Sequence, residues 1–481
     1  MEKTSGLFTD FYELTMAQGY WKQQINQNAV FEMFFRRNPF GGGFSVFAGL
    51  QTLLDKLAGF SFSAGDIDYL RSLGMFDADF LAWLAAFRFS GDVFAQDEGN
   101  VVFPQEPLLR VSGSLIECQI IEGLVLNTIN FQSLIATKAA RVFLAAGKGA
   151  IMEFGLRRAQ GADGALSGSR AAFIGGAQAT SNVEAGKKFG LTVMGTMAHS
   201  WVMAFPSEEE AFRAYAQLYP EHPVFLIDTY DTLKSGVENA IKAGAEVAKR
   251  GGNFGVRLDS GDIHYLSLEV RKRLDAAGFP RATIAVSNDL DEEIIATLVG
   301  NRAPVDSWGV GTKMITGGQD SAFAGVYKLT AHQRTSGELA PVIKFSDNPE
   351  KTTVPAVKQV WRVTDKNGMA LADINALDDG ADSETFEAGA VYTFYHPSAD
   401  YRHFRCLLEA PPRALLKKYV AAGRQITPPV PLSALRQHCI AGLDTLDPSY
   451  KRILNPHIYK VSISEKVRNL KLELIKKYLG E

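Results

Sequence analysis

The amino-acid sequence predicts an α/β protein in which an irregular, TIM-like (β/α) barrel is flanked by segments that form an α+β domain. Between residues 150 and 312, seven short apolar runs end in polar residues and alternate with helical stretches, as parallel strands covered by helices do. Alternating β-type runs separated by turn residues lie before and after this region. The first apolar run lacks a GxGxxG turn, which favours a closed barrel over an open dinucleotide-binding sheet.

Length and composition define the class of protein. A chain of 481 residues is too long for one ordinary core. We predict an N-terminal α+β domain at 1–145, a barrel at 146–332, and a C-terminal segment at 333–481, β-rich and then helical, that packs with the N-terminal domain. The chain is 46% hydrophobic and 21% charged, with a net charge of −3, so it has no basic surface suited to a nucleic acid.

Cysteine usage and the N-terminus indicate the compartment. The three cysteines lie far apart without a CxxC pair, which argues against a disulfide scaffold or a zinc site. The first residues carry acidic side chains where a signal peptide needs an apolar run, and we expect no later stretch to be long and apolar enough to span a bilayer. We expect a soluble, cytoplasmic protein with no membrane partner.

The flanking elements follow from local patterns. Residues 9–21 predict a capped helix, whose Tyr12 is either part of a core stripe or a stacking surface for a flat ligand. The other predicted segments are a strand at 30–35, helices at 53–87, antiparallel strands at 89–121, a long apolar helix at 124–146, β-structure from 328 to 395, and helices from 413 to 481 interrupted by PPVPL.

Within the predicted barrel, the polar residues that end each apolar run would share one rim. They are Arg157 with Arg158, Ser181 with Asn182, His199 with Ser200, Asp228 with Asp231, Asp259 with Asp262, Ser287 with Asn288 and Asp289, and the turn from Gly309 to Thr312. Each Asp, Ser or Asn alone is most simply explained as a helix cap. Arginines, acids, one histidine and a Gly-Thr turn together are harder to explain by capping.

Three parts of this rim suggest a phosphorylated sugar as the ligand. Arginines and the turn at Gly311 and Thr312 can hold phosphate through guanidinium and backbone N–H groups. Asp259 and Asp262 flank Gly261, a spacing that suits ribose hydroxyls or a Mg²⁺ ion shared with phosphates, so these two are the candidate metal ligands. His199 is either a hydrogen-bonded structural histidine or a catalytic group.

Long motifs across nearly the whole chain resemble the nicotinate phosphoribosyltransferase family. They are TDFYELTMAQGYW, FRRNPFGGGF, EFGLRRAQGADGAL, SRAAFIGGAQATSNVEAG, GTMAHSWVMAF, VRLDSGD, SNDLDE and NPHIYKVSIS. The resemblance implies an ATP-coupled ligase with pentosyltransferase chemistry. Nicotinate and phosphoribosyl pyrophosphate would give nicotinate mononucleotide and diphosphate, while ATP is hydrolysed and Mg²⁺ assists. It also implies a homodimer with shared active sites.

The resemblance further implies roles for single residues. His199 matches the histidine that ATP phosphorylates, and Asp259 matches a catalytic contact to the sugar. Phe154, together with Tyr12 of a second subunit, matches the pair of rings that encloses the pyridine, and Arg157 lines that slot. The remaining matches are to sugar and phosphate contacts: Arg257, Ser260, Gly311 and Thr312.

One position bears on the choice of base. Nicotinamide-using relatives carry an acidic residue where this chain has Ser181, and a carboxylate there would repel the carboxylate of nicotinate. Nicotinate is therefore the expected base, with a nicotinamide- or quinolinate-using enzyme of the same fold as the alternative. A regulatory nucleotide sensor is a second alternative, although it would be expected to have a degraded rim. Ala356 departs from the family pattern, which usually has glycine there, and this puts the loop conformation in doubt.

Overall fold

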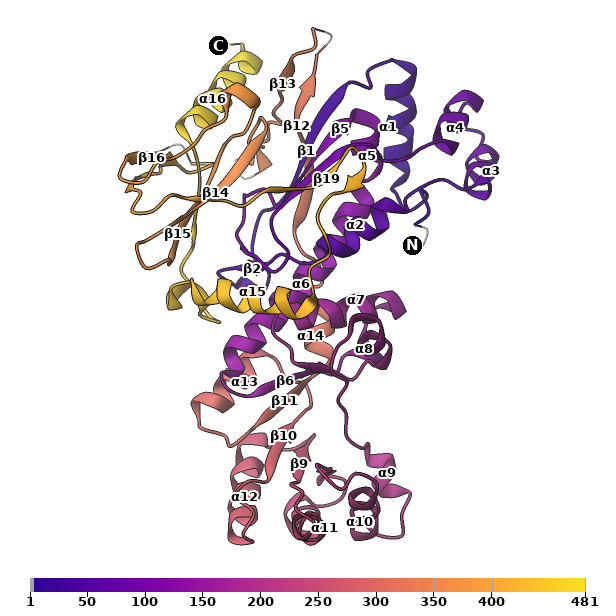
Figure 1. Cartoon of the computed structure of the whole chain (residues 1–481), viewed down its shortest axis with the longest axis vertical. Coiled ribbons are helices and arrows are strands. Elements are labelled where there is room, and N and C mark those ends of the chain that lie inside the picture. The colour runs from indigo at the N-terminus through magenta and orange to yellow at the C-terminus, as the bar shows by residue number, and fades with distance from the viewer. Residues whose placement is uncertain (1–3, 335, 349–350, 400, 481) are drawn as a thin grey trace. The chain divides into compact units, whose positions relative to one another are not determined.

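The computed structural model describes residues 4–334, 336–348, 351–399 and 401–480. The chain forms two compact units (Figure 1). The first contains residues 1–134 and 322–481, and the second contains residues 135–321. The N- and C-terminal segments thus share one unit, while the divisions fall near, but not at, the boundaries predicted at 145 and 332.

The second unit is built on a parallel sheet of six strands in the order β7-β6-β11-β10-β9-β8. Its strands are β6 (Ala150–Glu153), β7 (Ala179–Thr180), β8 (Val224–Leu226), β9 (Gly255–Leu258), β10 (Thr283–Val286) and β11 (Ser307–Val310). Its helical segments are η2 (Leu156–Arg158), α7 (Gly161–Ile174), α8 (Val183–Phe189), α9 (His199–Met203), α10 (Glu208–Leu218), the π-helix η3 (Thr232–Gly236), α11 (Val237–Lys249), α12 (Ile263–Ala276), α13 (Glu292–Gly300) and α14 (Thr312–Thr316).

This sheet confirms the predicted alternation of strands and helices, with one exception. The run around Gly195 forms no strand: an isolated parallel bridge joins Val193 to Thr180, and the chain is then irregular up to α9. The two edge strands of this sheet, β7 and β8, do not pair with each other within the described residues, so a closed barrel is not shown.

The first unit contains two larger sheets. One has the order β13-β12-β1-β5-β3-β19-β20, the other β17-β16-β21-β15-β14-β18, and β2 pairs with β4 in a small third sheet. The strands are β1 (Asn28–Phe35), β2 (Ser45–Val46), β3 (Asp92–Ala95), β4 (Val101–Val102), β5 (Leu109–Ser114), β12 (Gly325–Gln333), β13 (Leu339–Pro341), β14 (Lys358–Thr364), β15 (Ala370–Leu377), β16 (Val391–Tyr395), β17 (His403–Leu407), β18 (Arg413–Ala414), β19 (Lys417–Ala421), β20 (Arg424–Gln425) and β21 (Lys460–Ile463).

Helices complete this unit: α1 (Phe11–Lys22), α2 (Leu50–Ala58), α3 (Ala64–Ser72), α4 (Ala78–Ala85), α5 (Leu115–Ile120), the first part of α6 (Glu122–Ala146), α15 (Leu432–Asp444) and α16 (Glu465–Leu479). Strand β1 lies between β12 and β5 and is buried along all but its first residue, which explains why its sequence is mostly apolar. The exception within the buried part is Glu32, whose carboxylate pairs with Lys358 at 2.8 Å. Figure 1 shows α16 beside β15 and β16, which it contacts.

Two sequence-based assignments in this unit are wrong in part. Residues 115–120, predicted as β-structure, form α5, because the hydroxyl of Ser114 accepts a hydrogen bond from the N–H of Glu117 and caps a helix. Residues 413–425, predicted as helical, form β18 to β20, and β19 pairs with β3. Pairing with β3, which lies far away in the sequence, therefore outweighs the helical pattern of the local sequence.

The stretch Leu115–Ala146 passes the length and composition test for a membrane-spanning helix, alone among the described residues. The expectation that no such stretch exists is therefore wrong. Its most apolar window is 72% buried inside the protein, as in the core helix of a globular domain.

Candidate active site

Several of the predicted site residues meet where β8 and β9 end. Asp228 follows β8, Arg257 lies within β9, and Asp259 and Ser260 follow β9. Because neighbouring parallel strands end at the same edge of a sheet, these side chains emerge together. The ends of β10, β11 and β6 continue this edge in order.

Asp228 is the centre of this group. Its side chain is only 2% exposed, and it accepts three hydrogen bonds: from the ring of His199 at 3.2 Å, from the backbone N–H of Asp259 at 3.1 Å, and from the hydroxyl of Ser260 at 2.5 Å. The carboxylate therefore fixes both the histidine and the turn that follows β9. Charge-assisted bonds of this kind are short and orienting.

His199 does not end a strand, as the sequence suggested; it is the first residue of α9. Its Nε2 faces Asp228, and its side chain remains 39% exposed. A carboxylate accepts but does not donate, so the neutral ring carries its proton on Nε2 and leaves a lone pair on Nδ1. Nδ1 has no hydrogen-bond partner within the described residues and is available to a ligand.

Arg257 links the irregular segment before α9 to this edge. Its guanidinium donates to the hydroxyl of Thr196 and to the carbonyl of Met197, and lies 3.8 Å from Asp259. Burial lowers the pKa of Arg257, an effect that the carboxylates of Asp259 and Asp228 oppose.

Two polar atoms buried near this point lack partners in the described part of the chain. They are Nε of Arg257 and the hydroxyl of Thr229, which follows Asp228. Buried polar groups are normally paired, so both atoms are suited to meeting a polar ligand.

Phe154 and the glycines of β11 form the next part of the edge. The N–H of Phe154 donates to the carbonyl of Val310, and a Cβ added at Gly309 would lie 2.6 Å from the Phe154 ring. The same Cβ would lie 3.2 Å from Cβ of Ser287, whose hydroxyl bonds Asp259. Gly309 thus makes room for the aromatic ring, and Ser287 connects the ring to the Asp228 group.

Ser181 lies on the other side of Phe154. Its N–H donates to the backbone carbonyl of Glu153, and its hydroxyl has no hydrogen-bond partner among the described residues. The buried carboxylate of Glu153 accepts from the hydroxyls of Ser169 at 2.8 Å and Thr180 at 2.6 Å. Glu153 therefore fixes the ends of β6 and β7, between which Phe154 and Ser181 stand.

The remaining predicted residues divide into those near this edge and those serving as caps. Arg157, in η2, is near enough to Arg257 to lower its pKa, and Gly311 and Thr312 join β11 to α14. Asp262 caps α12 by accepting the N–H of Tyr265 at 3.1 Å. Capping is also the role of Asn182 and Asp231.

Tyr12 lies in the first unit, on α1, and is 48% exposed. Burial of its hydroxyl and the carboxylate of Glu122 raise the pKa of Tyr12 to about 12. The described chain does not join Tyr12 to Phe154, so their pairing stays a prediction.

Family models match this chain in three consecutive parts. The nicotinate phosphoribosyltransferase N-terminal domain matches residues 7–130, the nicotinate phosphoribosyltransferase family matches 150–372, and the C-terminal domain matches 357–471. The nicotinate phosphoribosyltransferase of Bacillus subtilis is 41% identical over 98% of this chain and 95% of that protein. The chain belongs to the nicotinate phosphoribosyltransferase family.

Relatives of this family extend to eukaryotes. The human nicotinate phosphoribosyltransferase is 34% identical over 96% of this chain and 95% of that protein. The crystal structure of human nicotinic acid phosphoribosyltransferase superposes with a TM-score of 0.84 at 31% identity, covering 97% of this chain and 99% of that one. A nicotinate-nucleotide pyrophosphorylase from Pyrococcus furiosus has a TM-score of 0.70 at 22% identity, which is a likeness of fold alone.

Sequence reasoning gave no role to three residues that organise this site: Asp228, Thr196 and Glu153. Asp228 was recognisable as the acid after an apolar run, but the same pattern fits Asp231 and Asp262, which are caps. Thr196 and Glu153 act through contacts with β9 and β7, and nothing in the local sequence marks them.

Proposed function

We propose that this protein converts nicotinate and phosphoribosyl pyrophosphate to nicotinate mononucleotide and diphosphate, the first step of NAD salvage from nicotinic acid. The proposed reaction is coupled to hydrolysis of ATP to ADP and phosphate, as in an ATP-coupled ligase. The observation that carries the proposal is the edge of the parallel sheet, along which three groups lie: a histidine nitrogen with no partner in the described residues, the largely buried Arg257, and the ring of Phe154.

We also propose that the parallel sheet is curved toward a barrel. Support comes from the segment between Val193 and His199. It bridges β7 at Val193, contacts β9 through Thr196, and meets Asp228 after β8 through His199. A short segment that contacts strands near both ends of the pairing order supports a curvature that brings those ends toward each other.

Phe154 and Ser181 are the proposed walls of the nicotinate slot. The ring of Phe154 offers a stacking surface, and the free hydroxyl of Ser181 can donate to the carboxylate of nicotinate. Arg157 supplies positive charge beside the slot. Tyr12 of a second subunit would cover the other face of the pyridine.

Arg257, Asp259 and Ser260 are the proposed contacts to the sugar and its phosphates, with the turn at Gly311 and Thr312 holding the 5′-phosphate. Mg²⁺ fits this donor set as an ion carried mainly by substrate phosphates, because no group of three or more metal-ligating side chains occurs within the described ranges. Asp259 is the best candidate to hold it, whereas Asp262 already accepts a backbone N–H as a cap. The ion would neutralise charge on the departing diphosphate.

His199 is the proposed phosphate acceptor. Nδ1 attacks the γ-phosphorus of ATP, the bond to the bridging oxygen breaks, and ADP leaves. Asp228 holds the Nε2 proton and stabilises the positive charge that develops on the ring. Water later cleaves the N–P bond and releases phosphate. In the other half of the reaction, the pyridine nitrogen attacks C1 of the ribose and diphosphate leaves.

A homodimer with shared sites is part of the proposal. Helix α1 and Phe8, two residues before its N-cap, expose large apolar side chains that a monomer would leave in water: Phe8, Phe11, Tyr12 and Met16 are 37–48% exposed. Mixing Tyr12→Ala chains with His199→Ala chains should restore partial activity. Failure in verified heterodimers would exclude a shared site. A cytoplasmic location is also proposed, because ATP is an intracellular substrate and all three cysteines are free thiols.

The ATP-coupled step is tested by incubating the protein with γ-labelled ATP and measuring acid-labile label on the chain. The wild type should become labelled, and His199→Ala should lose both the label and the stimulation of turnover by ATP. His264→Ala is a matched control, because its ring bonds the carbonyl of Asn301 elsewhere in the unit. Undiminished ATP stimulation in His199→Ala would exclude the role assigned to this histidine.

The alternative base, nicotinamide or a quinolinate-like dicarboxylate, is tested at Ser181. Ser181→Asp should raise KM for nicotinate by about 100-fold, because two carboxylates would then share a dry slot. The same change should improve use of nicotinamide. Equal turnover of nicotinate and nicotinamide by the wild type would favour the alternative.

A further inference from the structure

The first unit contains a cavity of about 380 Å³ that has no part in the proposed reaction. Its apolar wall consists of Leu50 from the start of α2, Leu435 from α15, and Pro428 and Val430 from the PPVPL stretch. Prolines fix the backbone before α15, so this wall is preformed rather than assembled around a ligand. The volume falls within the range of small-molecule sites, about 300–1,000 Å³.

His438, on the same helix as Leu435, provides a defined hydrogen-bond acceptor in the lining. Its Nε2 lies 2.7 Å from Oδ1 of Asn100, and Nδ2 of Asn100 donates to Gln96 at 3.2 Å. The Asn100 oxygen must therefore accept, and Nε2 must carry the proton. Burial lowers the pKa of His438, so the ring is neutral and Nδ1 is a bare acceptor with no partner in the described chain.

Charged groups of opposite sign lie beside this acceptor. Asp97 accepts from Lys417 at 2.6 Å and from the hydroxyl of Tyr419 at 2.7 Å. The buried Glu98, which also lines the cavity, accepts from the N–H of Gly49 at 2.5 Å and of Gln51 at 3.3 Å. These carboxylates and the ammonium group are thus already bonded within the protein, so the lining offers a charged ligand no unpaired counter-charge.

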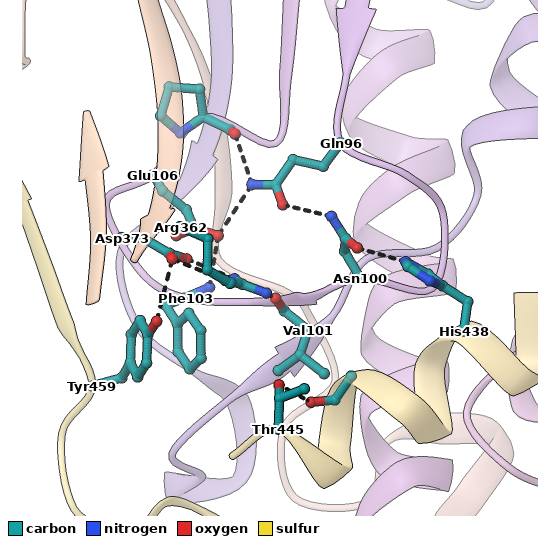
Figure 2. A network of polar contacts seen from close by, with 12 residues as sticks. Gln96, Asn100, Val101, Phe103, Glu106, Arg362, Asp373, His438, Thr445 and Tyr459 are labelled. Carbon is teal, nitrogen blue, oxygen red and sulfur yellow. Dashed lines mark hydrogen bonds and ion pairs between the residues drawn. The ribbon is translucent and has the colours of Figure 1, made fainter. Parts of the chain in front are cut away.

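A buried network holds the acceptor in place. Figure 2 shows hydrogen bonds running from His438 through Asn100 and Gln96 to Glu106, next to the ion pair of Arg362 and Asp373. Every residue of this network belongs to the first unit. The side chain that faces the cavity is therefore fixed from behind by a packed core, which is how specific binding sites keep their donors and acceptors aligned.

We propose that this cavity is a second ligand site that binds an uncharged, planar nitrogen heterocycle carrying an exocyclic N–H₂ group. The N–H₂ group donates to Nδ1 of His438 and to Asp97, and the ring packs on Leu50, Leu435 and the proline wall. A phosphorylated or carboxylated form of the same heterocycle is disfavoured, because Lys417 in the lining already bonds Asp97. A ligand here contacts both N- and C-terminal segments of the chain, so its binding stabilises the first unit.

The test uses the purified full-length chain and isothermal titration calorimetry with two uncharged probes, adenosine and nicotinamide. Their anionic counterparts, adenosine monophosphate and nicotinate, are titrated in parallel. Ala434→Phe fills the cavity from an exposed helix position that lines it, and Ser433→Phe is the matched control on the neighbouring residue outside the lining. Val430→Trp fills the same cavity from the proline wall, in case Ala434→Phe does not fold.

At least one uncharged probe should bind the wild type and raise its Tm. Ala434→Phe should weaken that binding by about tenfold or more, and Ser433→Phe should leave it within about twofold. Binding that is insensitive to Ala434→Phe or Val430→Trp lies elsewhere and overturns the proposal. It is also overturned if neither uncharged probe binds at millimolar concentration, or if an anionic counterpart binds equally well in the same Ala434-dependent way. The proposal does not depend on the proposed function.

Discussion

Nε2 of His199 lies 3.2 Å from Oδ1 of Asp228, and the other oxygen of Asp228 holds the turn after β9. One buried carboxylate therefore sets the orientation of the histidine and the position of Asp259 and Ser260. The two halves of the proposed reaction, phosphorylation of the histidine and binding of the sugar, share this residue.

Asp228→Asn should lower kcat by about 100-fold, because an amide can donate to Nε2 and so favour the tautomer that protonates Nδ1. Labelling of His199 by ATP should fall in parallel, a result that a merely structural effect would not produce. Asp231→Asn is the control: Asp231 caps η3, and asparagine caps equally well. Normal labelling in Asp228→Asn would show that Asp228 does not direct the tautomer.

Gly309→Ala should raise KM for nicotinate by about tenfold, with a smaller effect on phosphoribosyl pyrophosphate. The added Cβ would lie 2.6 Å from the Phe154 ring and must displace it. Gly300→Ala is the matched control, since a Cβ there meets nothing within 4 Å. Steady-state kinetics with each substrate varied in turn measures the difference, and an unchanged KM for nicotinate would remove Phe154 from the slot.

Ala356→Gly should stabilise the protein by about 0.5–1 kcal/mol. Ala356 is buried and has a φ of 74°, a conformation that costs a residue with a Cβ roughly 1–2 kcal/mol. The greater freedom of glycine in the unfolded chain offsets part of that gain. Ala414→Gly, within β18, should destabilise instead. Urea denaturation measures both, and destabilisation by Ala356→Gly would show that the lost methyl packing outweighs the strain.

Glu106→Gln should make the free energy of unfolding fall less as pH rises. Burial, followed by the carboxylate of Asp373, raises the pKa of Glu106 well above 4.5, so the folded state binds a proton that the unfolded state releases. Its contribution to stability is full below the unfolded pKa and is lost as pH rises toward the folded value. This loss amounts to at most about 1.4 kcal/mol per pH unit in that window. Glutamine does not titrate, so the loss should be absent from the variant.

Urea denaturation at several pH values between about pH 5 and pH 8 compares the wild type with Glu106→Gln. Asp373→Asn tests the same network in the other direction. It leaves the buried guanidinium of Arg362 without its carboxylate and should cost about 3–5 kcal/mol. Identical pH profiles for the wild type and Glu106→Gln would show that Glu106 is ionised in the folded state.

The sequence predicts the parallel β/α pattern well because each strand there is fixed by its own apolar run and each helix by its own cap. It predicts poorly where partners are distant. Strand β19 forms because β3 offers an edge about 320 residues away, and α5 forms because of a single serine cap. The sequence singles out His199 as a candidate, but its place at the start of a helix depends on contacts with the ends of β8 and β9.

Dependence on distant partners also explains why some rim residues could not be told apart from the sequence. Asp228, Asp231 and Asp262 look alike in sequence, yet only Asp228 is buried against His199, whereas the others accept backbone N–H groups. The departure at Ala356 was recognisable from the family pattern, and the structure shows why glycine suits this position, because the residue has a positive φ.

The central claim is tested most directly by measuring mononucleotide formation from nicotinate and phosphoribosyl pyrophosphate with Mg²⁺, with and without ATP, and with nicotinamide in parallel. We expect turnover of nicotinate that ATP stimulates, and little turnover of nicotinamide. No product from nicotinate under these conditions would contradict it.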